Sequence, residues 1–129
     1  MALVPNAGAF VTVEQATGAA GAAVTLTIPA VASMRHAITN ILIMRAASTV
    51  MTGTARLAIT TTNLPDAMEW TVGNAVAAGG TQTDVSLTFN TPLLSSVANT
   101  DTTIVLPDPE AGTLVIWTAQ VFYYLVPEL

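Results

Sequence analysis

Short stretches in which aliphatic residues alternate with polar ones, each ended by proline or glycine, limit this chain to few folds. The clearest is residues 23–28, where valine, leucine and isoleucine alternate with threonine until Pro29 ends the stretch. A period of two places one set of side chains on each face of a β-strand. Glu and Gln are scarce, Lys is absent, and Pro or Gly interrupts nearly every long segment, which disfavours helices. The sequence therefore predicts an all-β chain.

The same rule gives about eight candidate strands. They cover residues 9–13, 23–28, 35–45, 54–61, 68–72, 84–89, 102–106 and 113–126. Turn-forming residues separate them, and the glycine-containing pairs at 73–74 and 79–80 predict a long loop. Short strands of this spacing favour a two-sheet antiparallel sandwich, with a jelly roll as the leading topology. An immunoglobulin-like sandwich is the second choice, although its cysteine and tryptophan landmarks are absent.

A chain of 129 residues has room for one domain and not for a second substantial core. Residues 1–22 differ in composition from the remainder, so we interpret them as an N-terminal arm or lead-in to a single β-sandwich domain over residues 23–129. The mean hydropathy is +0.62. The longest apolar stretch, 112–127, is nevertheless shorter than the roughly 20 residues of a spanning helix, and we expect no membrane partner.

The balance of charges excludes several classes of function. Arg35, Arg45 and Arg56 are the only fixed positive charges, and eight carboxylates oppose them to give a net charge of −5. Nucleic-acid binders need clustered Lys and Arg, so we expect no nucleic-acid partner. The absence of cysteine excludes disulfide scaffolds, cysteine-ligated zinc and thiol nucleophiles.

Charged residues make up only 9% of the chain, against about 25% in an ordinary soluble domain. Most residues of a domain this small are partly exposed, so its exterior must consist mainly of neutral polar and apolar side chains. Exteriors of that kind are typical of subunits that are buried in an assembly. We therefore predict an assembling subunit, and an unusually neutral monomer is the alternative.

The last expected strand is apolar on both faces, with Trp117 on one side and Phe122 and Tyr124 on the other. Only one face can point into the domain's own core. The other face needs cover, either from the N-terminal arm of the same chain or from a neighbouring subunit. The candidate interface residues are Leu3, Val4, Phe10, Trp70, Phe122 and Tyr124.

Candidate catalytic residues are few. His36 is the only histidine, and Ser33 three positions earlier would point to the opposite face of a strand. We expect instead a histidine at a strand end that is bonded to an acid or a carbonyl. No Gly-x-Ser-x-Gly motif is present. We therefore predict that the chain is not an enzyme and that it uses no cofactor.

The carboxylates form two local pairs, Asp66 with Glu69 and Asp108 with Glu110. Both pairs lie in turn-rich stretches, where acids are usually solvated. Asp101, Asp108 and Glu110 are also candidate ligands for a calcium ion. They lack the regular spacing of oxygen ligands in a calcium-binding loop, so we predict no metal site. The arginines are expected to pair with carboxylates at core edges or between subunits.

Four segments carry a resemblance to a known family. They are residues 23–36, 60–65, 92–99 and 121–124, which together span most of 22–126. In these segments the chain resembles a family of small tailed-phage virion proteins with β-sandwich or jelly-roll folds, some of which are head decoration (cement) proteins. The resemblance implies a homotrimer bound to the major capsid protein on the outer surface of the phage head, after synthesis in the host cytoplasm.

A carbohydrate- or receptor-binding module of a phage fibre, spike or tail is the rival interpretation, because jelly rolls also host sugar sites. Such a site needs an exposed aromatic platform with polar neighbours. Trp70, near Asp66 and Glu69, is the one loop-like candidate, although a core or interface anchor is the expected role for that side chain.

Overall fold

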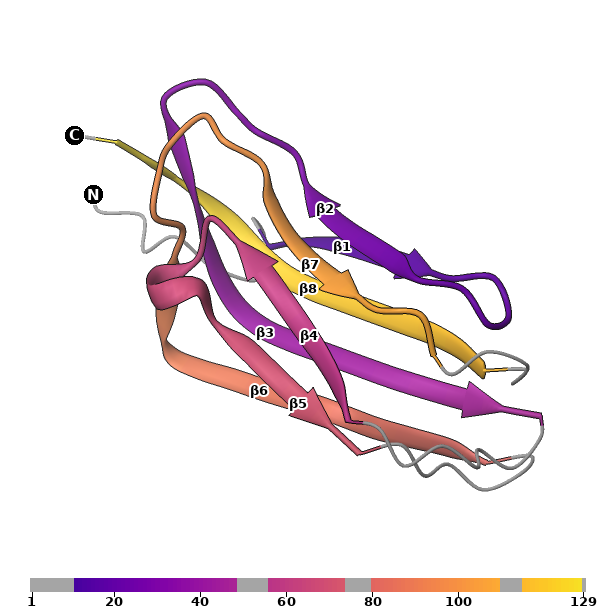
Figure 1. Cartoon of the computed structure of the whole chain (residues 1–129). Coiled ribbons are helices and arrows are strands. Elements are labelled where there is room, and N and C mark those ends of the chain that lie inside the picture. Colours follow the sequence, from indigo (N-terminus) through magenta and orange to yellow (C-terminus); the bar gives the residue numbers. More distant parts are fainter. Residues whose placement is uncertain (1–10, 49–55, 74–79, 110–114, 129) are drawn as a thin grey trace.

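The computed structural model describes residues 11–48, 56–73, 80–109 and 115–128. These residues form eight strands and one short 3₁₀ turn, η1 (Figure 1). The elements are β1 (Thr12–Thr17), β2 (Val24–Ile28), β3 (Met34–Ala47), β4 (Leu57–Thr62), η1 (Pro65–Ala67), β5 (Glu69–Val72), β6 (Thr81–Leu94), β7 (Thr102–Leu106) and β8 (Val115–Pro127). None of the described residues forms a helix long and apolar enough to cross a membrane.

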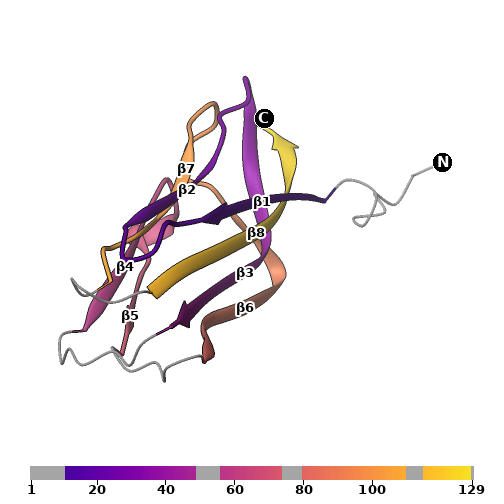
Figure 2. The same cartoon turned by 90° about the vertical axis from the view of Figure 1, so that its right-hand side faces the viewer.

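The strands form two four-stranded sheets, β1-β8-β3-β6 and β2-β7-β4-β5, which lie in separate layers (Figure 2). The pairs β1–β8, β2–β7, β3–β6 and β4–β5 are all antiparallel. The first half of the chain is thus paired with the second half in reverse order, as in a long hairpin wound into two layers. This strand order is that of a jelly roll, so the predicted two-sheet antiparallel sandwich is confirmed.

The hydrophobic core lies between the two sheets because alternate residues of each strand point inward. In β3 the inward residues Ile41 and Ile43 are 1% and 0% exposed, and in β8 Trp117 and Val121 are both 0% exposed. The opposite sheet contributes the fully buried Ile28, Ile59, Ile104 and Leu106. Burial of this apolar surface is the main term that stabilises the sandwich.

The predicted end of β6 at residue 89 is wrong, because the strand continues to Leu94. Its pairing with β3 jumps from Asn40↔Thr88 to Ile38↔Leu93, so the residues around Pro92 bulge out of the ladder. Since β6 is an edge strand, Pro92 does not have to donate a ladder hydrogen bond there. Proline would end a strand in the middle of a sheet, whereas a bulge in an edge strand tolerates it.

The first strand was predicted over residues 9–13, and in the described part of the chain it runs from Thr12 to Thr17. Its position is set by pairing with β8, which runs from Thr12↔Tyr123 to Thr17↔Thr118. Of the segment 1–22 that we interpreted as an arm or lead-in, residues 12–17 are therefore a strand of the sheet. Residues 1–10 lie outside the described part of the chain.

Candidate functional site

Over most of the outer face of the β1-β8-β3-β6 sheet, the described residues carry no charged side chain. Burial alternates along β8 and β3, so every second residue faces away from the core. We call this surface the neutral face. Its residues are Val13, Gln15, Thr17, Asn40, Leu42, Met44, Ala46, Ser86, Thr88, Ile116, Thr118, Gln120, Phe122 and Tyr124.

Side chains of the neutral face meet across neighbouring strands. Val13 lies opposite Phe122, which places an exposed aliphatic group beside a half-buried aromatic ring. Gln120 Nε2 donates a hydrogen bond to Gln15 Oε1 at 3.0 Å. At the end of the face, Arg35 forms an ion pair with Glu128 at 3.0 Å. The surface is thus a mixture of apolar groups, amides and hydroxyls, which is the composition of a protein interface core.

The predicted interface residues fall in different places. Phe122 and Tyr124 lie on the neutral face, each half-buried. Trp70, on β5, is half-buried and packs against the hydrophobic core from the other sheet, so its ring is not presented as an exposed platform. Leu3, Val4 and Phe10 lie outside the described residues.

The outer face of the second sheet is dominated by threonine. Thr25 and Thr27 of β2 are exposed there, as are Thr60 and Thr62 of β4. The hydroxyls of Thr62 and Thr103 are 2.7 Å apart. We call this surface the threonine face. Four exposed acids, Asp66, Glu69, Asp101 and Asp108, belong to its strands or to the loops next to them.

One end of the sandwich exposes large aliphatic side chains on well-connected loops. Val97 is 56% exposed on the β6–β7 loop, and Leu94 at the end of β6 is 43% exposed. Val31 and Leu125 are also exposed. A backbone hydrogen bond from Asn99 N to Met34 O at 3.0 Å joins the β6–β7 loop to the start of β3. These four aliphatic residues form what we call the apolar end.

Asn63 holds the β6–β7 loop in place. Its Oδ1 accepts a hydrogen bond from Val97 N at 2.8 Å, and its Nδ2 donates to Val97 O and Thr100 O. The backbone of Asn63 has φ 59°, a left-handed conformation that asparagine tolerates better than most residues. The sequence indicated a turn at this position but not an anchor for a second loop, because the partners are more than thirty residues away.

His36 lies beneath the apolar end and is 1% exposed. Its Nε2 lies 2.9 Å from Pro29 O and its Nδ1 lies 2.8 Å from Thr102 Oγ1. A neutral ring with the proton on Nε2 satisfies both contacts, since Nε2 donates to the carbonyl and Nδ1 accepts from the hydroxyl. The predicted carbonyl partner is confirmed. The ring therefore links β3 to the start of β7 and to the loop that follows β2. Both ring nitrogens are buried and already hydrogen-bonded within the protein.

The carboxylates that we considered for a cation are kept apart by the fold. Asp101 Oδ1 accepts a hydrogen bond from Ala30 N, and Asp108 Oδ1 accepts one from Ala23 N, each at 2.7 Å. They therefore lie at opposite ends of β7 and fasten both ends of β2. Glu110 lies outside the described residues. Among the residues that the structure does describe, no group of three or more His, Asp or Glu is placed to hold a metal ion.

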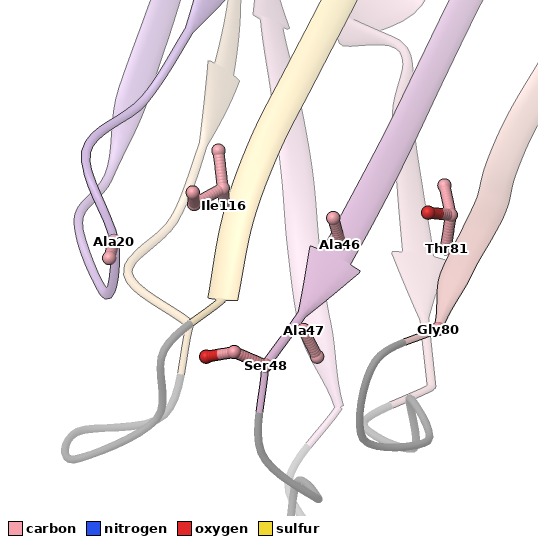
Figure 3. A pocket seen from close by; sticks show the side chains of 7 residues that line it. All are labelled: Ala20, Ala46, Ala47, Ser48, Gly80, Thr81 and Ile116. Carbon is pink, nitrogen blue, oxygen red and sulfur yellow. The ribbon is translucent and has the colours of Figure 1, made fainter.

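A pocket of about 370 Å³ lies at the end of the sandwich opposite the apolar end (Figure 3). Small side chains line it, including Ala46, Ala47 and Thr81, and Ile116 of the neutral face closes one side. None of the lining residues that the structure describes has a titratable side chain. These residues therefore supply no acid or base to the pocket.

Comparison with known proteins assigns no family to the chain. No protein-family model matches it, and no curated protein matches it at a significant level. The observations that bear on function are therefore the jelly-roll fold, the neutral face and the apolar end. Proteins with this fold have many unrelated functions, so the function has to be inferred from the surfaces of the molecule.

Proposed function

We propose that this chain is a structural subunit of a virion, a decoration (cement) protein of a tailed-phage head. The observation that carries the proposal is the neutral face, an outer sheet surface without charge over three of its four strands and with exposed Val13 and Ile116. Such a surface is stabilised by contact with another protein surface, which removes its apolar area from water. An assembling subunit is the class of protein that this surface fits best.

The jelly-roll strand order and the sequence resemblance to small tailed-phage virion proteins support the choice of a capsid over other assemblies. Jelly rolls build viral capsid domains and lectins alike, so the fold alone does not choose between them. Trp70 packs against the core and is not available as the exposed sugar platform that the lectin interpretation requires. We therefore favour capsid decoration, by a homotrimer, over glycan or receptor binding.

We assign the apolar end to contact with the major capsid protein. Val97 is 56% exposed, yet the loop that carries it is fixed by Asn63, so little conformational entropy is lost when that loop is buried. About 1,000 Å² of contact in each subunit, repeated at symmetric positions, reinforces the seams between capsomers against the pressure of packed DNA. The net charge of −5 suits the outside of the shell, away from DNA.

The proposal is tested by adding the full-length chain to capsid shells prepared without it and measuring cosedimentation and the temperature of shell rupture. We expect saturable binding at a fixed number of copies and a higher rupture temperature. Val97→Asp should weaken binding because it places a charge in the apolar contact. Thr27→Asp on the threonine face is the matched control and should bind normally. The proposal is abandoned if the unaltered chain binds no shell, or if it binds defined sugars on a glycan array instead.

The N-terminal residues Leu3, Val4 and Phe10 give a second arm of the same experiment. Deletion of residues 1–10 leaves β1, which begins at Thr12, intact. We expect the shortened chain to unfold at the same denaturant concentration as the full chain and to bind shells more weakly. Equal binding by both would show that the predicted role of these three residues is wrong.

A further inference from the structure

We infer that the neutral face is covered by a second copy of this chain. This inference rests on the proposed function in one respect, that the chain is a subunit that assembles. Leu42 and Phe122 lie on the two inner strands of the sheet, β3 and β8. Beside them, Val13 of the edge strand β1 pairs with Phe122, and Gln120 of β8 pairs with Leu42. An aromatic ring with aliphatic neighbours is typical of the residues that contribute most to binding.

The distribution of charge points to this face as the one at which copies meet. Four exposed acids, Asp66, Glu69, Asp101 and Asp108, belong to the other sheet or its loops. Glu128, which follows β8, is exposed as well, but it is ion-paired with Arg35 at the end of the neutral face. Two chains of net charge −5 repel each other, and the repulsion is largest where these acids would approach one another. Contact through the neutral face keeps Asp66, Glu69, Asp101 and Asp108 of both copies apart and in water.

The polar groups of the neutral face suit an identical partner. Amides such as those of Gln15, Gln120 and Asn40 carry both donors and acceptors, as do the hydroxyls of Thr118 and Thr88. Two copies can therefore satisfy each other's polar groups without any matching charge. A partner with many charged residues would instead bury charges that this face cannot pair, at a large cost in desolvation.

Two of the four sheet edges, β6 and β5, are less suited to association. β6 is interrupted by two register shifts against β3, and it contains Pro92. β5, the edge of the other sheet, has only four residues. Bulges, prolines and short lengths are devices that prevent edge-to-edge pairing. The face, which has no such protection, is the surface through which copies associate.

The test measures molar mass by light scattering and sedimentation over a range of concentrations, on the full-length chain. A double variant, Val13→Glu with Gln15→Glu, adds two charges to the neutral face at exposed positions of β1. Thr25→Glu with Thr27→Glu adds two charges to the threonine face at exposed positions of β2 and is the matched control. Unfolding curves check that both variants keep the fold.

We expect the unaltered chain and the threonine-face variant to form the same multiple of the 13.3 kDa chain. The neutral-face variant should dissociate with a constant at least about 100-fold higher, because like charges face each other in the contact. The inference is overturned if the unaltered chain is monomeric, or if the threonine-face variant dissociates and the neutral-face variant does not. Binding to capsid shells is measured in a separate experiment. If the chain self-associates but binds no shell, only the proposed function is refuted.

Discussion

Arg45 and Asp84 form a two-point ion pair inside the sandwich, with 0% and 1% of their side chains exposed. Arg45 Nε and Nη2 donate to the two carboxylate oxygens at 2.6 and 2.7 Å. Nη2 also donates to Gly73 O at 2.6 Å, which links β3 to the end of β5 in the other sheet. The guanidinium lies 5.1 Å from the centre of the Trp117 ring. The pair thus joins β3, β6 and β5 through one buried group.

Removing one partner of this pair should be much more harmful than removing both. We expect Asp84→Ala to lower the free energy of unfolding by about 3–5 kcal/mol, because it leaves a buried guanidinium without its counter-charge. The double variant Arg45→Met with Asp84→Ala should recover part of that loss. Denaturant unfolding of both variants measures the difference. A loss below about 1 kcal/mol for Asp84→Ala would mean that the charge is not confined in the core.

Asn63 should be the single residue on which the β6–β7 loop depends most. Asn63→Ala removes the acceptor of Val97 N and leaves a β-carbon at φ 59°, so we expect a loss of about 2–3 kcal/mol. Asn63→Gly removes the same hydrogen bonds without the backbone strain and should be about 1 kcal/mol less damaging. Unfolding curves and amide exchange in residues 95–101 provide the measurement. Equal stability of the two variants would exclude the backbone contribution.

The carboxylates that fasten β2 should stabilise the sheet although they are exposed. We expect Asp101→Ala and Asp108→Ala each to lower the free energy of unfolding by about 1 kcal/mol. Each substitution removes a carboxylate that accepts a hydrogen bond from a backbone N–H at 2.7 Å. Glu69→Ala is the control, because that side chain is exposed on β5 and should change stability by less than about 0.5 kcal/mol. Thermal unfolding measures the stability of the three variants. If Glu69→Ala lowers stability as much as the two aspartate variants do, the hydrogen bonds to β2 are not the cause of the loss.

Tyr123 should make the fold sensitive to alkaline pH. Burial raises the pKa of its hydroxyl, and the nearby Glu14 carboxylate raises it further. The folded chain therefore keeps the proton above the ordinary tyrosine pKa of about 10, where the unfolded chain releases it, so stability is full below that pH and falls above it.

The measurement is the urea midpoint of the unaltered chain and of Tyr123→Phe between pH 7 and pH 11. We expect the unaltered chain to lose stability above about pH 10 and the Phe variant to lose less. The chain has no lysine, so few other groups titrate in that range. Parallel pH profiles for the two chains would show that Tyr123 does not carry the effect.

Alternation along the chain predicted the strands well wherever one face is buried. β7 has the predicted bounds, and β2 differs by one residue, because their aliphatic and hydroxyl residues alternate without interruption. The pattern was weaker at β1 and at the end of β6. The β1 sequence has little alternation of its own and is ordered by β8, and Pro92 is accommodated by a bulge that only the edge position of β6 permits.

The candidate surfaces were only partly accessible to sequence reasoning. Scarcity of charge predicted a neutral exterior, and the two apolar sides of the last strand predicted that Phe122 and Tyr124 face away from the core. The apolar end was not predicted, since Val31, Leu94, Val97 and Leu125 come from different parts of the chain. The role of Asn63 was missed for the same reason, because its amide bonds a loop that follows two strands later.

The sequence by itself determined the all-β class, the approximate strands and the shortage of charge, because these depend on residue type and on a period of two along the chain. Only the tertiary structure decided which strands are neighbours and which charges are paired. Strand order depends on contacts between distant segments, and the register of β3 against β8 decides which side chains share the neutral face. The burial of Arg45 with Asp84 likewise follows from the packing of the two sheets.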